Sequence, residues 1–330
     1  MPAAPGSSRL ETIPAGEAEA TQAVARLIEV RVRAAARNGP AHRDAHPKAH
    51  GCAEAYLDVL PNLPPEFAVG LFAEPRRYAA WLRFSNGAEK PDVDNARDAR
   101  GIAIKIMGVA GSRSDTQDFL MINGRRFFVR DAADYLELQT KIARPLGFFF
   151  PGWNPFKFRL SELFAFEAIA GMRVSNPLNI VYGSITPFLY GQTACKFSIR
   201  PAGAPSSFVD RSTRDFLRDN LVRSLEKLEA AFDFCVQLRE NPSSMPIEDP
   251  TIEWPETESP FVPVARIVIP RQSIDTPARA IFSENLSFTP WHGLDDHRPL
   301  GGINRVRRTV YETISSLRHA LNGSPREEPS

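Results

Sequence analysis

Short apolar segments separated by turn residues constrain the fold of this chain more than any other feature. The clearest of them, residues 101–107, alternates in part between apolar and polar side chains, as a half-buried strand does. The 29 prolines among 330 residues are about twice the usual share and favour turns over long helices. The pattern therefore predicts an antiparallel sheet or barrel. The other predicted strands are 52–60, 67–72, 79–85, 119–122, 127–129, 179–185, 195–200, 232–238 and 264–269.

Helical periodicity appears at intervals along the same chain, so the predicted fold class is α+β, an antiparallel β-barrel with surrounding helices. We expect a flexible N-terminal tail at 1–16, one folded domain at 17–322 and a C-terminal tail at 323–330. Residues 240–263 hold six prolines and six acidic residues, which indicates an extended surface connection that still packs. The predicted helices are 17–37, 131–142, 156–172, 213–231 and 303–321.

Charge and cysteine content exclude several classes of protein. With 40 Lys+Arg against 39 Asp+Glu the net charge is +1, which argues against nucleic acid as a partner. No run of 18 apolar residues predicts a transmembrane segment, and the first 16 residues contain no apolar signal core. The cysteines, Cys52, Cys195 and Cys235, are far apart and odd in number, so we expect no disulfide framework and a cytoplasmic setting.

The last predicted helix places two arginines and a tyrosine at one edge of its apolar stripe. On a wheel of 100° per residue, Tyr311 and Arg318 lie within about 40° of Arg307. Arg307 and Tyr311 are four residues apart and can touch, and a neighbouring guanidinium favours the charged form of a phenol. A tyrosine that covers the core between two surface arginines is the alternative interpretation. The stripe itself consists of Ile303, Val306, Val310, Ile314, Leu317 and Leu321.

Three histidines, His42, His46 and His50, follow one another at intervals of four residues. On a helix this spacing would present a metal-binding face. Pro40 and Pro47 oppose a continuous helix there, so a polar loop is the alternative.

Three longer motifs accompany the strands. Residues 82–87 read LRFSNG, residues 95–105 read NARDARGIAIK, and residues 118–131 read DFLMINGRRFFVRD. On composition alone the charged pairs in them also suit ordinary turns. Taken in this order, however, the motifs resemble those of the haem catalases, and the resemblance extends over about residues 40–320. It implies a catalase-like barrel that binds one haem b.

The resemblance also implies roles for individual residues. His46, within Arg43-Asp44-Ala45-His46, matches the distal acid–base of the family, Ser85 its hydrogen-bond partner and Asn123 the distal asparagine. Arg307 and Tyr311 match the proximal R-x-x-x-Y, in which the tyrosine is the iron ligand. The family's three propionate-binding arginines correspond to Arg43, Arg83 and Arg318.

The implied function is haem-dependent reduction of hydrogen peroxide and organic hydroperoxides, a peroxidase with some catalase activity. The chain departs from full-length catalases in four ways: only a short segment follows Tyr311, the N-terminal arm is short, Ala45 replaces valine, and Asn86-Gly87 replaces a bulkier pair. These departures resemble the small, catalase-related peroxidase branch without the helical C-terminal domain. They predict a wider entrance that admits organic hydroperoxides and an organic electron donor.

Two other functions remain open on the same scaffold. One is a fatty-acid hydroperoxide isomerase or lyase, which needs no external donor, and the other is a non-enzymatic haem-binding module. A homodimer is also left open. Ten of the 22 phenylalanines fall between Phe119 and Phe166, either as packing core or as an apolar lip that admits organic hydroperoxides or docks on lipid.

Overall fold

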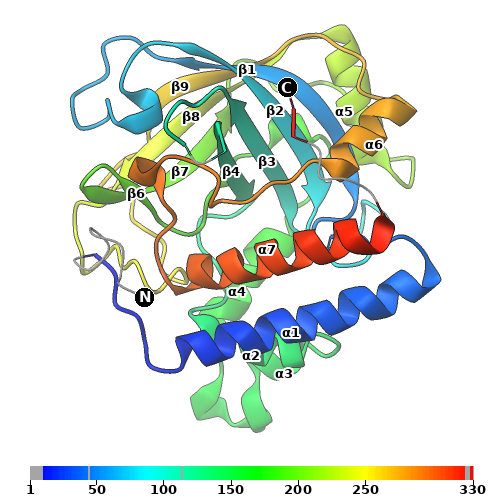
Figure 1. The fold of residues 1–330 in the computed structure, drawn as a ribbon, viewed down its shortest axis with the longest axis vertical. Helices are drawn as coiled ribbons and strands as arrows, with labels where there is room; N and C mark the ends of the chain where they lie inside the picture. The colour runs from blue at the N-terminus through cyan, green and yellow to red at the C-terminus, as the bar shows by residue number, and fades with distance from the viewer. Residues whose placement is uncertain (1–9, 44, 113, 324–327, 330) are drawn as a thin grey trace.

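A closed antiparallel barrel forms the body of the molecule (Figure 1). The computed structural model describes residues 10–43, 45–112, 114–323 and 328–329. The described strands follow the order β5-β4-β3-β2-β1-β9-β8-β7-β6, and β5 also pairs with β7, which closes a ring of eight strands. The barrel prediction is therefore confirmed. The strands are β1 (Ala49–Val59), β2 (Arg77–Asn86), β3 (Arg100–Met107), β4 (Thr116–Ile122), β5 (Tyr182–Gly183), β6 (Phe188–Tyr190), β7 (Thr193–Pro201), β8 (Ala230–Leu238) and β9 (Val262–Ile269).

Alternate residues of each strand fill the barrel interior, because successive side chains of a strand point to opposite faces. Leu82 and Phe84 of β2 point into this core together with Ile104 and Phe119 of β3 and β4. The residues between them, Arg83 among them, lie on the outer face. That face is also buried at the end of β2, so something must cover it.

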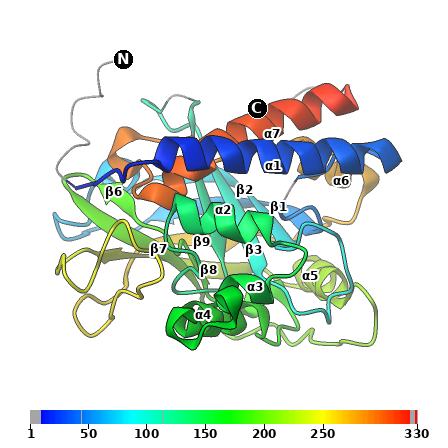
Figure 2. The ribbon, with the colours of Figure 1, turned by 90° about the horizontal axis from the view of Figure 1, so that it is seen from below.

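The two long helices, α1 and α7, lie side by side beneath the barrel (Figures 1 and 2). The shorter helix α2 packs against α1. The apolar stripe of α7, with Val310 and Ile314, packs against Val24 and Ile28 of α1. The arginine edge of α7 is thereby left on the barrel side of this contact. The helices are α1 (Glu17–Ala35), α2 (Ala132–Thr140), α3 (Leu146–Phe149), α4 (Leu160–Ala170), α5 (Phe216–Lys227), α6 (Pro277–Asn285) and α7 (Gly302–Asn322).

Several predicted strands are wrong or too long. Residues 67–72 end in a single 3₁₀ turn, because Gly70 adopts a left-handed φ of 55° that no strand accepts. Residues 127–129 form no strand, since Phe127 and Phe128 pack instead into an aromatic cluster. Of 179–185 only Tyr182–Gly183 pairs as a strand.

Three elements were not predicted: β6, α3 and α6. The start of α6 carries a recognisable signal, because Thr276 caps the helix through Arg279 N and Pro277 stands at its first position.

Both predicted tails contain residues outside the described part of the chain, namely 1–9, 324–327 and 330. Glu11, which is described, forms ion pairs with Arg298 and Arg305, so this part of the first tail is held against the body. The connection at 240–263 packs through buried Met245 and Trp254, as expected. Within the described residues, the search for a helix with the length and apolarity of a membrane span finds none.

Candidate functional site

The outer face of β2 supplies two of the predicted site residues. Arg83 and Ser85 are two positions apart and therefore share this face. Pairing with β3 places Ala103 beside Arg83 and Gly101 beside Ser85. Arg83 and Ser85 are both buried although the barrel core lies on the other side of the strand.

His46 joins Ser85 just before β1 begins. Its Nδ1 lies 3.0 Å from Ser85 Oγ, and its backbone has a left-handed φ of 62°. The imidazole packs flat against Gly101, where an added Cβ would lie 2.4 Å from His46 Cε1. Gly101 is thus a site residue that the sequence reasoning missed, although it stands inside the quoted motif RDARG.

The surroundings of His46 hold the imidazole in its neutral form. Burial lowers its pKa to about 4, and the positive charges of Arg83, Arg307 and Arg43 act in the same direction. Near pH 7 the ring can therefore accept a proton at the nitrogen that does not face Ser85. Since Arg307 belongs to α7, this histidine faces the gap between barrel and helix.

The three predicted propionate-binding arginines converge on one carboxylate, Glu284 of α6. Arg43 Nη1 lies 2.9 Å from Glu284 Oε2, and Arg318 Nη1 lies 2.9 Å from Glu284 Oε1. Arg83 Nη2 approaches the same carboxylate at 4.0 Å, while its Nη1 donates to His46 O at 3.0 Å. The sequence reasoning missed Glu284 because it predicted no helix there.

The arginine cluster concentrates buried positive charge. Burial lowers the pKa of Arg43 well below its usual value, and the nearby Arg83 charge adds to the effect. Burial likewise lowers the pKa of Arg83. The Nε of Arg83 is buried and has no hydrogen-bond partner. A carboxylate in this cluster stabilises cations that the protein has removed from water, and guanidinium groups suit carboxylates geometrically.

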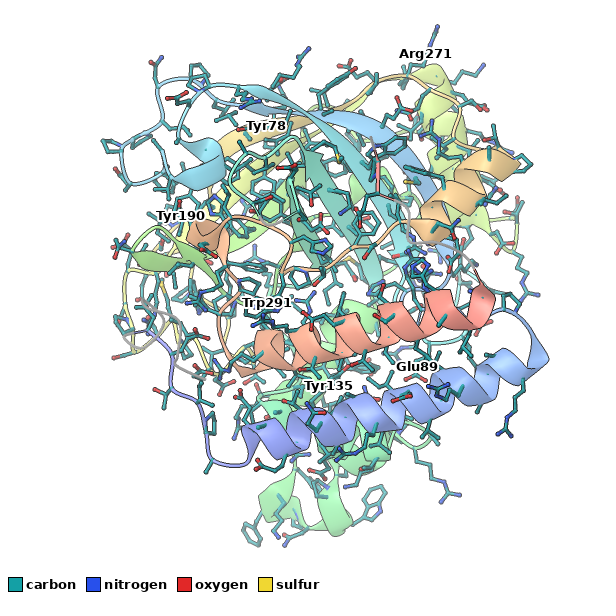
Figure 3. All side chains as sticks on the ribbon, viewed as in Figure 1. Tyr78, Glu89, Tyr135, Tyr190, Arg271 and Trp291 are labelled. Atoms are coloured by element: carbon teal, nitrogen blue, oxygen red, sulfur yellow. The ribbon has the colours of Figure 1, made fainter. Side chains whose placement is uncertain are left out.

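On α7, Arg307 and Tyr311 do touch. The guanidinium carbon lies 5.5 Å from the centre of the Tyr311 ring, and Arg307 Nη1 donates to Asn304 Oδ1 at 3.1 Å. Asn304 is itself held by Trp291, whose indole Nε1 donates to Asn304 O at 3.0 Å. Figure 3 labels Trp291 beside the first turns of this helix. Arg307 Nη1 also lies 3.5 Å from Thr186 Oγ1, in the turn between β5 and β6. Tyr311 is therefore half-buried beside a guanidinium that Asn304 and Thr186 orient.

Asn123, which the resemblance matches to the distal asparagine, is bound through both ends of its amide. Its Oδ1 accepts from Arg100 N at 2.6 Å, and its Nδ2 donates to Ile169 O at 2.8 Å. Both ends of the amide are bound to backbone groups, so its contacts tie α4 to the barrel.

The three histidines spaced by four residues do not share a metal-binding face. His42 is half-exposed and lies 3.9 Å from Glu284, whereas His50 is buried and bonded to Asn86 at 2.7 Å. The search of the described residues finds no group of three metal-ligating side chains. Gly87 and Ala45 are the two positions expected to widen an entrance. Gly87 lies against Ala99, and a Cβ added to Gly87 would be 2.9 Å from the Cβ of Ala99. Ala45 is exposed.

Comparison with solved structures identifies the architecture. A fungal catalase matches over 88% of this chain and 61% of its own, with 16% identity and a TM-score of 0.67. The chain has a catalase-like fold. A bacterial catalase matches over 91% and 63% (14% identity, TM-score 0.65), and catalase A from Saccharomyces cerevisiae over 91% and 67% (17% identity, TM-score 0.62). This catalase-like chain thus spans about two thirds of the length of those catalases. No family model matches its sequence, and neither does any curated protein.

Proposed function

We propose that this chain is a haem-dependent peroxidase that reduces hydrogen peroxide and organic hydroperoxides, with some catalase activity. The observation that carries the proposal is the convergence of Arg43, Arg83 and Arg318 on one carboxylate beside the neutral His46. The catalase-like fold also supports the proposal.

The residues fit haem b. The cluster already accepts the carboxylate of Glu284, and the unpaired Nε of Arg83 leaves a further donor for a propionate. Arg43, Arg83 and Arg318 would hold the propionates, and Tyr311, beside Arg307, would bind the iron. When bound, haem supplies the electron-transfer chemistry that cleaves a peroxide O–O bond.

The side chains of this chain would move the proton. Ser85 orients the imidazole of His46 through Nδ1, and the pKa of about 4 keeps the other nitrogen free to accept a proton. His46 takes the proton of ROOH from one peroxide oxygen and delivers it to the other, so that water or an alcohol leaves. An aromatic donor supplies two electrons and two protons, which balances ROOH to ROH and water. Asn123 is proposed to support the site through its tether to α4.

Haem titration of the purified protein, followed by its absorption spectrum with and without peroxide, tests the proposal. Product analysis with a fatty-acid hydroperoxide then separates the activities. Reduction yields the alcohol and consumes donor, whereas an isomerase or lyase rearranges or cleaves the substrate without donor. A protein that binds haem and leaves peroxide unchanged would be a haem-binding module. Because the three cysteines are free and buried, we also propose the cytoplasm as its compartment.

A further inference from the structure

The segment around α3 and α4 exposes apolar side chains that lie outside the candidate site. Within nineteen consecutive positions, five large apolar residues are exposed, and Phe156 is 97% exposed. We call these five the aromatic tip: Leu146, Trp153, Phe156, Leu160 and Phe164. Of the 16 exposed large apolar side chains among the described residues, seven lie between Ile142 and Met172, so this concentration differs from scattered surface residues.

A rigid base holds the aromatic tip away from the barrel. Phe148 and Phe149 are buried directly beneath it. Phe150 stacks on Trp153 with ring centres 5.7 Å apart, and Asn154 Oδ1 accepts from Phe156 N at 3.1 Å. In Figures 1 and 2, α3 and α4 lie together on the side of the molecule that carries α2. These contacts tie the segment that carries the exposed side chains to its own buried rings.

Positive charge surrounds the aromatic tip. Arg144, Lys157 and Arg173 are exposed, and none of them has a carboxylate within ion-pair distance in the described residues. The acidic side chains of α4 are already paired, Glu162 with Arg130 and Glu167 with Arg97. The tip thus combines exposed aromatic residues with cations whose charge is available to a partner.

We propose that the aromatic tip docks on the surface of an anionic phospholipid bilayer. Exposed Trp, Phe and Leu side chains insert at the boundary between headgroups and acyl chains, and lysine and arginine beside them contact lipid phosphates. The available cations at Arg144, Lys157 and Arg173 give the charge complementarity that selects anionic lipid.

Co-sedimentation of the full chain with vesicles tests the docking. The probes are vesicles of phosphatidylcholine alone and vesicles with about one third phosphatidylserine. We expect binding to the anionic vesicles, with a shift of tryptophan emission to shorter wavelength because Trp153 is 75% exposed. Replacing Trp153 and Phe156 with serine should weaken partitioning about tenfold or more for each aromatic.

The controls separate lipid docking from general surface effects. Val30→Ser with Ile281→Ser removes two exposed apolar residues elsewhere and should leave partitioning unchanged. Lys157→Gln should weaken binding to anionic vesicles about fivefold and leave phosphatidylcholine unaffected. No vesicle binding by the parent, or equal binding by the tip and control variants, would overturn the proposal. So would a parent dimer that Phe156→Ser dissociates, because the tip would then be covered by a second copy. None of these readouts depends on haem.

Discussion

The candidate site and the aromatic tip reverse the usual distribution of polar and apolar side chains in opposite directions. In the site, Arg83 and Arg318 are buried between the barrel and α7. At the tip, Phe156 and Trp153 project into water. Charged side chains are most stable in contact with water, and aromatic side chains are most stable away from it. Both arrangements therefore destabilise the fold unless another group contacts these side chains. The proposals for the two regions differ accordingly: an anionic ligand at the site, and an apolar surface at the tip.

A second buried charge shows how a complete arrangement differs. Lys105 and Asp118 are both fully buried, and they pair with each other at 3.0 Å. Asp118 also accepts from Thr289 N, so its remaining oxygen is satisfied. This pair needs no ligand. In the arginine cluster, by contrast, Arg43, Arg83 and Arg318 share the carboxylate of Glu284.

The largest expected effect tests whether the site side of α7 holds the cofactor. Tyr311→Phe removes the phenol that is proposed to bind iron while keeping the ring that packs beside Arg307. We expect haem affinity to fall by more than about 100-fold. This is more than the usual effect of removing a residue that only hydrogen-bonds to a metal ligand. The absorption spectrum during haem titration measures it. Tyr135→Phe, on α2, is the matched control. An unchanged spectrum in Tyr311→Phe would assign the iron to another ligand.

The next effect tests the proton acceptor. His46→Ala should retain haem but slow the first reaction with peroxide by about 10²- to 10⁴-fold. Because its pKa of about 4 keeps His46 neutral, the parent rate should not fall between pH 7 and about pH 5. Stopped-flow absorption measures both quantities. His42→Ala, at the half-exposed histidine, is the control. A parent rate that halves near pH 6.5 would contradict the neutral assignment.

Sequence reasoning recovered the strands of the barrel because alternation is a local property. Residues 101–107 carry it clearly and form β3. It failed at Phe127 and Phe128, where an equally apolar run packs into an aromatic cluster instead of pairing. A short apolar run does not specify which of these it will do, because tertiary packing decides it.

The site was recovered unevenly for a similar reason. His46 and Ser85, which the motifs name as a pair, lie within hydrogen-bond distance, and their catalytic roles stay a prediction. Glu284 was missed because an acidic residue about 240 positions from Arg43 carries no spacing pattern. The binding of Asn123 to Ile169 also depends on how α4 docks, which the strand motif alone does not contain.

Acid should weaken the fold through buried histidines outside the site. Burial lowers the pKa of His50 and of His297 to about 4, whereas an unfolded histidine titrates near 6.5. Between these values the unfolded chain binds protons that the folded chain does not, so stability falls as pH falls. At pH 5 we expect a loss of about 2 kcal/mol for each histidine relative to pH 7.5.

Urea unfolding at both pH values measures this loss. His297→Gln keeps an acceptor for Leu71 N, which His297 Nε2 now binds at 3.0 Å. This variant should therefore lose less stability on acidification than the parent does. Equal pH dependence in the two proteins would show that His297 does not titrate in this range.

A smaller effect, on the free energy of unfolding, tests the role of the Glu284 carboxylate among the three arginines. Glu284→Gln removes the carboxylate that Arg43, Arg83 and Arg318 share, and we expect the haem-free protein to lose about 1–3 kcal/mol. The loss is below that for a fully buried pair because Glu284 is partly exposed. Glu29→Gln, at an exposed pair with Arg33, should change stability by less than about 0.5 kcal/mol. Inorganic phosphate should stabilise Glu284→Gln more than the parent; equal stabilisation would mean that the cluster does not bind anions.

The smallest expected change is that of Phe156→Ala, which is compared with a change in the core beneath the aromatic tip. Phe148 and Phe156 are the same residue type eight positions apart, but Phe148 is 0% exposed and Phe156 is 97% exposed. Phe148→Ala leaves a cavity among packed rings and should cost about 3–5 kcal/mol of unfolding free energy. Phe156→Ala removes a side chain that already contacts water, so the change should stay within about 0.5 kcal/mol. Urea unfolding of both variants without lipid measures the contrast. A loss at Phe156 comparable with that at Phe148 would show that the tip packs in solution, and its exposure would then no longer argue for an external partner. If only Phe148→Ala lowers the free energy of unfolding, Phe156 does not stabilise the fold, and contact with an external partner is the role that we propose for it.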